Sequence, residues 1–142
     1  MISWDAATGW ARPYLHADHQ GSIVALAFAG VRAVQMATRL ANARALGAAG
    51  EAAVRAGFDI GPRESITVLG RTRIPDGITR TALSEVKNVA RLSLSSQLRD
   101  YAFFARQSAL SFDLYVRPTT SLSGPLEQLA SDGGVNILRI PQ

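Results

Sequence analysis

Two stretches, Arg73-Ile-Pro-Asp-Gly77 and Ala82-Leu-Ser-Glu-Val-Lys-Asn-Val89, contain the residues on which the fold and the chemistry of this chain depend. The first predicts a turn, because proline fixes its own φ and an Asp-Gly pair favours a tight reversal of the chain. The second predicts a strand, and since side chains alternate between the two faces of a strand, Glu85 and Lys87 share one face. A turn leading into this strand would place Asp76 beside Glu85. The sequence therefore predicts two carboxylates and one ammonium group at a single site.

The segments around these stretches predict a mixed β-sheet flanked by helices, which is an α/β (α+β) fold. A hairpin is expected at Gly70, and Ser123 is expected to cap the last helix. The strand that begins near Phe112 alternates apolar with polar residues and is expected to be half-buried. The predicted strands cover residues 65–69, 71–75, 81–89, 112–117 and 135–140. The predicted helices cover residues 31–46, 51–56, 95–109 and 123–131, with Gly47 and Gly50 separating the first two.

The composition is that of one compact domain. The chain has 142 residues, 47% of them hydrophobic and 18% charged, so a packed core is expected and global disorder is not. The net charge of +4 suits a polyanionic partner such as nucleic acid but does not identify one. The absence of cysteine excludes disulfides and thiolate metal sites. The longest apolar run, residues 23–30, is far shorter than the roughly 20 residues of a membrane span, and the N-terminus lacks the basic start of a secretory signal.

The only lysine in the chain is Lys87, whereas the other 14 basic residues are arginine. Paired carboxylates offer the hard oxygen ligands that Mg²⁺ prefers, with Mn²⁺ as an alternative, and Lys87 could then stabilise charge on a phosphate or help to activate water. Gln97 and Tyr101 lie one helical turn apart, from where they could reach substrate phosphates or brace the site. Each motif alone is more typical of a solvent-exposed strand or an ordinary turn. Their order along the chain favours an active site.

Four blocks of sequence resemble a known family. The matching blocks are Arg-Ile-Pro-Asp-Gly at 73–77, Ser-Glu-Val-Lys-Asn-Val at 84–89, Gln-Leu-Arg-Asp-Tyr at 97–101 and Phe-Asp-Leu-Tyr-Val-Arg at 112–117. They resemble the restriction-endonuclease-fold toxin domains of bacterial polymorphic (Rhs-type) toxins, which belong to the PD-(D/E)xK nuclease superfamily. The resemblance covers about residues 47–142. It implies a restriction-endonuclease-like core of helix, three strands, helix and strand.

The resemblance also implies roles for individual residues. Asp76 and Glu85 would bind the divalent metal, Lys87 would be the catalytic lysine, and Gln97 with Tyr101 would form a Gln-x-x-x-Tyr motif that acts in catalysis and substrate binding. The eight residues between Asp76 and Glu85 fit a tight hairpin, although they leave little room for loops that read a substrate.

The superfamily often adds a carboxylate from the first core helix, and Glu51 is the candidate here, with Glu64 as the alternative. An equally good interpretation of Glu51 is an acid favoured by the dipole at a helix N-terminus. Arg73 is a candidate substrate-binding residue, because it is one of four arginines that flank the site in sequence and could contact a nucleic-acid backbone. The other three are Arg71, Arg80 and Arg91.

The N-terminal segment contains His16-Ala-Asp-His19, which suggests a metal site but lacks a fourth ligand. Residues 14–22 instead resemble a core motif found near the end of Rhs/YD-repeat shells, the large proteins that encase such toxins. On this interpretation residues 1–30 are a shell remnant or linker, residues 31–46 a connecting helix, and residues 47–142 the nuclease toxin domain.

The resulting hypothesis is a Mg²⁺-dependent endonuclease toxin that cleaves nucleic acid, with DNA favoured, in competition between bacteria. RNA, including tRNA, is the alternative substrate. A catalytically inactive nucleic-acid-binding module is a second hypothesis, and an immunity-type interaction protein ranks last because nucleic-acid mimics tend to be acidic. The resemblance implies a cognate immunity protein, an Rhs-type shell and a secretion apparatus. It further implies a secreted effector that passes from the cytoplasm of its producer into the cytoplasm of a target cell.

Overall fold

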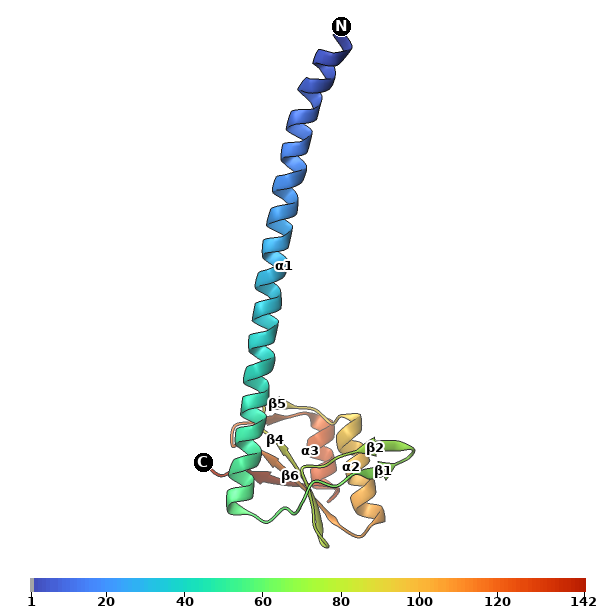
Figure 1. The fold of residues 1–142 in the computed structure, drawn as a ribbon. Helices are drawn as coiled ribbons and strands as arrows, with labels where there is room; N and C mark the ends of the chain where they lie inside the picture. The colour runs from blue at the N-terminus through green and yellow to red at the C-terminus, as the bar shows by residue number, and fades with distance from the viewer. Residues whose placement is uncertain (1) are drawn as a thin grey trace. The chain divides into compact units, whose positions relative to one another are not determined.

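The computed structural model describes residues 2–142 of the chain, with side chains from residue 28 onward (Figure 1). The Cα positions form two units, residues 1–42 and residues 43–142. Helix α1 (Ile2–Gly57) makes up the described part of the first unit and continues into the second. The His16–His19 motif and the shell-like segment around it lie outside the residues whose side chains are described. Within the described residues, no helix is both long enough and apolar enough to span a lipid bilayer.

α1 runs without interruption through Gly47 and Gly50, so the predicted division into two helices is wrong. A Cβ atom at Gly50 would lie 2.8 Å from the Cβ of Asn88. The side-chain nitrogen of Asn88 also donates a hydrogen bond of 2.8 Å to the carbonyl of Leu46. Gly50 therefore permits a close approach between helix and sheet, and a glycine inside a helix costs only about 1 kcal/mol relative to alanine.

The second unit contains a main sheet of four strands in the order β3-β4-β6-β8. Strands β4, β6 and β8 run parallel to one another, and β3 pairs antiparallel with β4. This arrangement confirms the predicted mixed sheet. The strands are β3 (Gly77–Ile78), β4 (Ala82–Lys87), β6 (Ser111–Val116) and β8 (Asn136–Arg139).

Helices cover both faces of the main sheet (Figure 1). The two further helices are α2 (Ser96–Gln107) and α3 (Gly124–Ser131). They pack against one face, in a core that joins Leu98 of α2 and Leu126 of α3 to Leu114 of β6. The end of α1 covers the other face, where Val54 packs with Tyr115. Tyr115 is consequently buried, and β6 is not half-buried as predicted but covered on both faces, as is usual for a strand between two parallel neighbours.

Four short strands form two separate pairs. β1 (Ile66–Val68) and β2 (Arg71–Arg73) form the hairpin predicted at Gly70. Leu69 and Gly70 both have positive φ, 48° and 77°, which is the conformation of a tight two-residue turn. β5 (Arg91–Leu92) and β7 (Ser121–Leu122) form a parallel pair that the sequence did not predict, because two residues are too few to show alternation.

A serine precedes each of the two shorter helices. The Ser95 hydroxyl accepts a hydrogen bond of 3.3 Å from the backbone nitrogen of Leu98 and so caps α2. Ser123 occupies the cap position of α3, as predicted, but its hydroxyl makes no cap bond. It accepts instead from the backbone nitrogen of Leu94, at 3.3 Å. Ser123 therefore ties the start of α3 to the loop before α2.

Candidate active site

Asp76 and Glu85 lie side by side because β3 and β4 pair antiparallel. Gly77 is opposite Ser84 in this pair, so Asp76, the residue before β3, is opposite Glu85. The backbone nitrogen of Asp76 donates to Oε2 of Glu85 at 3.2 Å, and the backbone nitrogen of Val86 donates to Oδ2 of Asp76 at 2.9 Å. The structure thus brings together the two carboxylates that the turn and the strand pattern predicted would meet.

Gly77 is needed at this turn because the segment after α1 packs directly on the backbone of β3. A Cβ atom at Gly77 would lie 2.2 Å from the carbonyl oxygen of Ile60, closer than any side chain permits. The backbone nitrogen of Ile78 donates a hydrogen bond of 3.0 Å to the carbonyl of Pro62. These contacts fix the loop that carries Arg63 next to the site.

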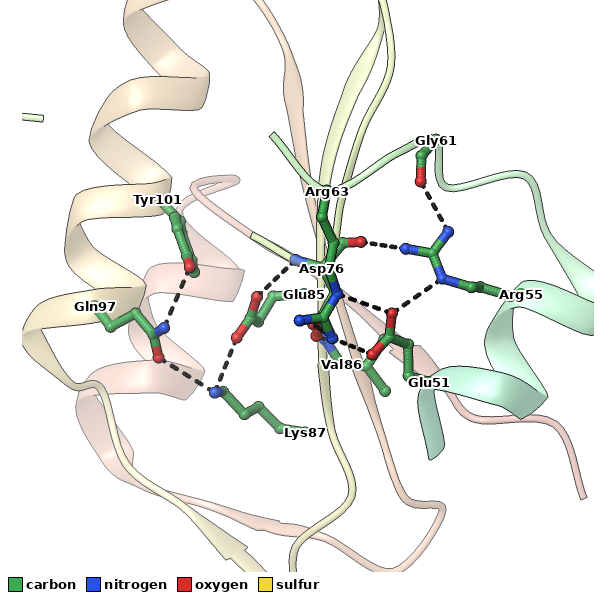
Figure 2. Close-up of polar contacts among 10 residues, drawn as sticks. All are labelled: Glu51, Arg55, Gly61, Arg63, Asp76, Glu85, Val86, Lys87, Gln97 and Tyr101. Atoms are coloured by element: carbon green, nitrogen blue, oxygen red, sulfur yellow. Dashed lines mark hydrogen bonds and ion pairs between the residues drawn. The ribbon is translucent and has the colours of Figure 1, made fainter. Parts of the chain in front are cut away.

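Lys87 shares a face of β4 with Glu85, as the strand periodicity predicted. Its Nζ lies 2.9 Å from Oε1 of Glu85 and donates at 3.2 Å to Oε1 of Gln97, which comes from α2 (Figure 2). The amide nitrogen of Gln97 in turn donates to the hydroxyl of Tyr101 at 3.2 Å. The ammonium group is therefore held between a carboxylate on its own strand and an amide on the neighbouring helix, while its side chain stays 27% exposed.

Tyr101 is completely buried. Its position in the sequence allowed it either to bind a substrate or to brace the site, and burial distinguishes between these two roles. A buried hydroxyl can support Gln97, but it does not reach a surface on which a substrate would lie. Burial also raises the pKa of Tyr101 to about 12, so the phenol remains neutral at physiological pH. Tyr101 therefore supports Gln97 from within the core, and the predicted contact between this side chain and a substrate does not fit its burial.

Glu51 reaches the same site from the last two turns of α1 (Figure 2). Because α1 begins at Ile2, Glu51 is not at a helix N-terminus, and the interpretation of this residue as a dipole-favoured acid is wrong. Its carboxylate accepts hydrogen bonds from Nε of Arg55 at 3.0 Å and from Nε of Arg63 at 3.2 Å. Glu64, the alternative candidate, is exposed in the loop after Pro62.

Arg63 connects Glu51 to Asp76. Its Nη2 contacts the second oxygen of Glu51 and lies 2.9 Å from Oδ1 of Asp76 (Figure 2). Arg55 holds the surrounding backbone, because it donates to the carbonyl oxygen of Gly61 at 2.8 Å and to that of Asp76. Two arginines therefore lie among the carboxylates, one bound mainly to the backbone and one bound to carboxylates.

The carboxylates differ in their electrostatic environment. Burial raises the pKa of both Asp76 and Glu85, and each pKa is raised further by a neighbouring carboxylate. The hydrogen bond from Arg63 holds the pKa of Glu51 below its ordinary value. Closely spaced carboxylates whose charges are disfavoured by burial bind a cation favourably, and such perturbed groups cluster at functional sites.

Arg73, the predicted substrate-binding residue, is bound to another part of the protein. Its Nε donates at 2.9 Å to Oδ2 of Asp100, and Arg71 pairs with the same carboxylate. Asp100 is buried at 3% exposure, and the hydrogen bond from Arg71 lowers its pKa to about 2. The three residues join the β1–β2 hairpin to α2. Arg73 therefore has a structural contact in this structure, and its contact with a substrate remains a prediction.

Sequence reasoning missed Arg55, Arg63 and Asp100. Arg55 follows Glu51 by one helical turn, a spacing that favours an ion pair and could have indicated the first of these contacts. Arg63 lies in a loop, where no periodicity predicts the direction of a side chain. Asp100 meets Arg71 across 29 residues of sequence, and nothing local indicates that contact.

A family model described as restriction endonuclease fold toxin 7 matches residues 47–126, more than half of the chain. The chain belongs to the restriction endonuclease fold toxin 7 family. Among curated proteins and among solved structures, the comparison finds no match. The matched segment of this toxin begins in α1 before Glu51 and ends within α3, so it contains every predicted site residue. Membership confirms the predicted family and the restriction-endonuclease-like fold, and it implies nuclease activity.

In this restriction endonuclease fold toxin, Asp76, Glu85 and Glu51 are the residues that could hold a divalent metal. Among the described residues, no three histidine or acidic side chains converge closely enough to form a metal site as they stand. The guanidinium of Arg63 lies between Glu51 and Asp76, so it is a cation held by the oxygens that a metal ion would use. The donor set of carboxylate oxygens fits a hard cation such as Mg²⁺.

The toxin also has a hollow of about 730 Å³ between α2, α3 and the beginnings of β6 and β8. Its lining residues include Phe103, Arg106 and Asn136, and none of the predicted site residues. The carboxylate site is therefore distinct from this hollow. The site lies at the end of β4 and in the turn before β3, where the Lys87 side chain is 27% exposed and Glu85 is buried.

Proposed function

We propose that this domain is a metal-dependent endonuclease that hydrolyses phosphodiester bonds of DNA and acts as a toxin in competition between bacteria. The observation that carries the proposal is the pairing of Asp76 with Glu85, with the ammonium of Lys87 only 2.9 Å from the Glu85 carboxylate. An acidic pair beside one fixed positive charge provides both a cation site and a group that binds a phosphate. Family membership supports nuclease activity in general.

Asp76 and Glu85 would hold Mg²⁺ or Mn²⁺, and Glu51 would add a third carboxylate. When bound, the ion supplies a Lewis acid that polarises the phosphate and makes water a stronger nucleophile. The water oxygen gives up a proton and bonds to phosphorus as the bond from phosphorus to the leaving sugar oxygen breaks, and the sugar oxygen takes up a proton from solvent. Lys87 stabilises the negative charge that develops on the phosphate oxygens.

Gln97 and Tyr101 position Lys87 for this role. The amide oxygen of Gln97 accepts from Lys87, and its amide nitrogen is bound to the buried Tyr101 hydroxyl, so the orientation of the amide is fixed. A side chain held before the substrate arrives does not have to be ordered during the reaction. This preorganisation supports a catalytic role for Lys87 over a purely structural ion pair.

The proposal of DNA as substrate rests on the net charge and on exposed arginines. The chain carries a net charge of +4, and Arg80 and Arg91 are exposed near the site in sequence. Arg71 is exposed as well, although it also pairs with Asp100. Arginines bind phosphates without regard to base sequence, so cleavage is expected to show little sequence preference. A deep cleft that would hold unpaired bases is not needed for such contacts.

The biological part of the proposal follows from the toxin family. We propose that the domain travels with an Rhs-type shell, leaves the cytoplasm of its producer through a secretion apparatus and acts in the cytoplasm of a target cell. The producer would need a cognate immunity protein against its own enzyme. Expression of the domain in a bacterial cytoplasm should therefore be toxic, and substitution of Lys87 should relieve the toxicity.

The decisive experiment compares the purified parent with Glu85→Ala and Lys87→Ala on plasmid, single-stranded DNA and total RNA, with Mg²⁺ or with EDTA. Arg99→Ala is a matched control, because Arg99 is an exposed residue of α2 outside the site. We expect the parent and the control to degrade plasmid in Mg²⁺ alone and both site variants to be inactive. Equal cleavage by all four proteins would contradict the site. Cleavage of RNA alone would make RNA the substrate, and salt-sensitive binding without product would indicate a non-catalytic module.

A further inference from the structure

We propose that Arg63 is an internal counter-ion, which occupies the cation position between Glu51 and Asp76 in the metal-free domain and must leave when a divalent ion binds. The proposal rests on the proposed function, since it requires that this site binds a metal. It goes beyond that function by assigning a role to a residue that neither the sequence motifs nor the family match single out.

The geometry places the guanidinium on the oxygens that face the site. Asp76 uses Oδ2 to accept from the backbone of Val86 and uses Oδ1 to accept from Arg63 at 2.9 Å. Glu51 presents both of its oxygens to Arg63 (Figure 2). The guanidinium therefore neutralises two carboxylates that belong to different elements, α1 and the turn before β3. A metal ion bound by the same two residues needs these oxygens.

The contacts of Arg63 are those of a group that can be displaced. In the described part of the chain, the Arg63 side chain binds the two carboxylates and is 52% exposed. Ion pairs at this exposure are weak, because water and salt screen them. Arg55 provides the contrast, because it also donates to the backbone carbonyls of Gly61 and Asp76 and thereby holds the loop in place.

Arg63 can leave the carboxylates by movement of its side chain alone. It lies between the end of α1 and the start of β1, where the backbone belongs to neither a helix nor a strand. A rotation of its side chain would release Oε2 of Glu51 and Oδ1 of Asp76 without moving α1 or β3, while Oε1 of Glu51 would keep its contact with Arg55. Glu51 and Asp76 are therefore held by α1 and by the turn before β3, whereas Arg63, the displaceable cation, comes from the loop between α1 and β1.

The test is the affinity of the metal-free domain for Mn²⁺ and Mg²⁺, measured by titration calorimetry on the full chain. Arg63→Gln removes the competing charge, so we expect its dissociation constant to be about tenfold lower than that of the parent, which corresponds to the loss of two half-exposed ion pairs. Arg99→Gln makes the same charge change on an exposed site of α2 and should leave the affinity unchanged. The dissociation constant of Arg63→Lys should lie between those of the parent and Arg63→Gln, because a lysine keeps the charge but cannot bridge two carboxylates.

Thermal unfolding provides a second readout that does not depend on activity. Without metal, Arg63→Gln should unfold at a lower temperature than the parent, because Asp76 loses the guanidinium that pairs with it and Glu51 keeps only that of Arg55. With saturating Mn²⁺ the difference should disappear. If Arg63→Gln is too unstable to isolate without metal, Arg63→Lys supplies both measurements.

The outcomes separate this proposal from the proposed function. Binding by parent and Arg63→Gln with equal affinity would overturn the role of Arg63 and leave the metal-dependent nuclease intact. An equal gain in metal affinity in Arg63→Gln and Arg99→Gln would show a general charge effect and would also overturn the role of Arg63. Absence of binding in every protein, at any metal concentration, would overturn the proposed metal dependence and this proposal with it.

Discussion

Replacement of Lys87 by methionine tests the site most directly, because it removes a charge and keeps much of the side-chain volume. Nζ of Lys87 lies 2.9 Å from Glu85 and 3.2 Å from Gln97, so the ammonium is fixed where a phosphate would approach. A unit charge about 4 Å from a phosphate oxygen interacts with it by about 4 kcal/mol at an effective dielectric constant of about 20. Since part of this energy is already present in the bound substrate, we expect kcat to fall by about 10²–10³-fold.

The same substitution should lower the stability of the domain. Glu85 is buried, and Lys87 is the cation that lowers its pKa, so Lys87→Met leaves a buried carboxylate without a counter-ion. Removal of one partner from a fully buried ion pair costs about 3–5 kcal/mol. The exposure of Lys87 reduces this to about 2 kcal/mol, which corresponds to a melting temperature lower by about 10 °C in a domain of about 100 residues.

The double variant Glu85→Gln/Lys87→Met separates the two effects. It removes both charges together, so its melting temperature should lie close to that of the parent while its activity stays lost. Plasmid cleavage in Mg²⁺ and thermal unfolding followed by circular dichroism measure the two quantities. Parent-like cleavage by Lys87→Met would refute the catalytic role of the lysine. A double variant no more stable than Lys87→Met would refute the argument from an unpaired buried charge.

Three further substitutions test other parts of the structure. Leu69→Gly should raise the free energy of unfolding by about 1 kcal/mol, because Leu69 is exposed with φ of 48° and glycine adopts that conformation without strain. An unchanged or lower midpoint of denaturant unfolding would contradict this. Gly77→Ala should lower the free energy of unfolding by about 1–3 kcal/mol and reduce cleavage, since the new Cβ would press on the carbonyl of Ile60 beside Asp76. Parent-like stability would show that this contact is not tight. Asp100 has a folded pKa of about 2 against an ordinary value of 3.8, so its contribution is complete above about pH 4 and is lost as pH falls toward 2. When the pH falls from 7 to 3, the free energy of unfolding should therefore decrease less in Asp100→Asn than in the parent. Equal decreases would argue against the Arg71–Asp100 ion pair.

The parts of the site that the sequence predicted depend on local rules. Alternation along one strand placed Glu85 and Lys87 on the same face, and the turn signal that precedes this strand placed Asp76 next to Glu85. Helical spacing placed Gln97 and Tyr101 together on α2. Each of these inferences spans few residues, so the local backbone geometry alone determines where the side chains lie relative to one another.

The parts that the sequence did not predict depend on packing between distant segments. Gly50 has the appearance of a helix breaker in the sequence, but it is the point where α1 approaches Asn88. The burial of Tyr101 follows from the packing of α2 on the sheet, which its helical spacing alone does not reveal. Arg63 reaches Asp76 from a loop, whose side-chain directions no periodic pattern fixes.

The last turns of α1 are part of the candidate active site. The carbonyl of Leu46 accepts from Asn88 beside β4, and Glu51 binds the arginine that contacts Asp76. If a protease liberates the toxic fragment from a longer polypeptide, its cut therefore has to fall before Leu46. A fragment that began only at Gly57, the end of α1, would keep Asp76, Glu85 and Lys87 but would lose Glu51, one of the two carboxylates that bind Arg63.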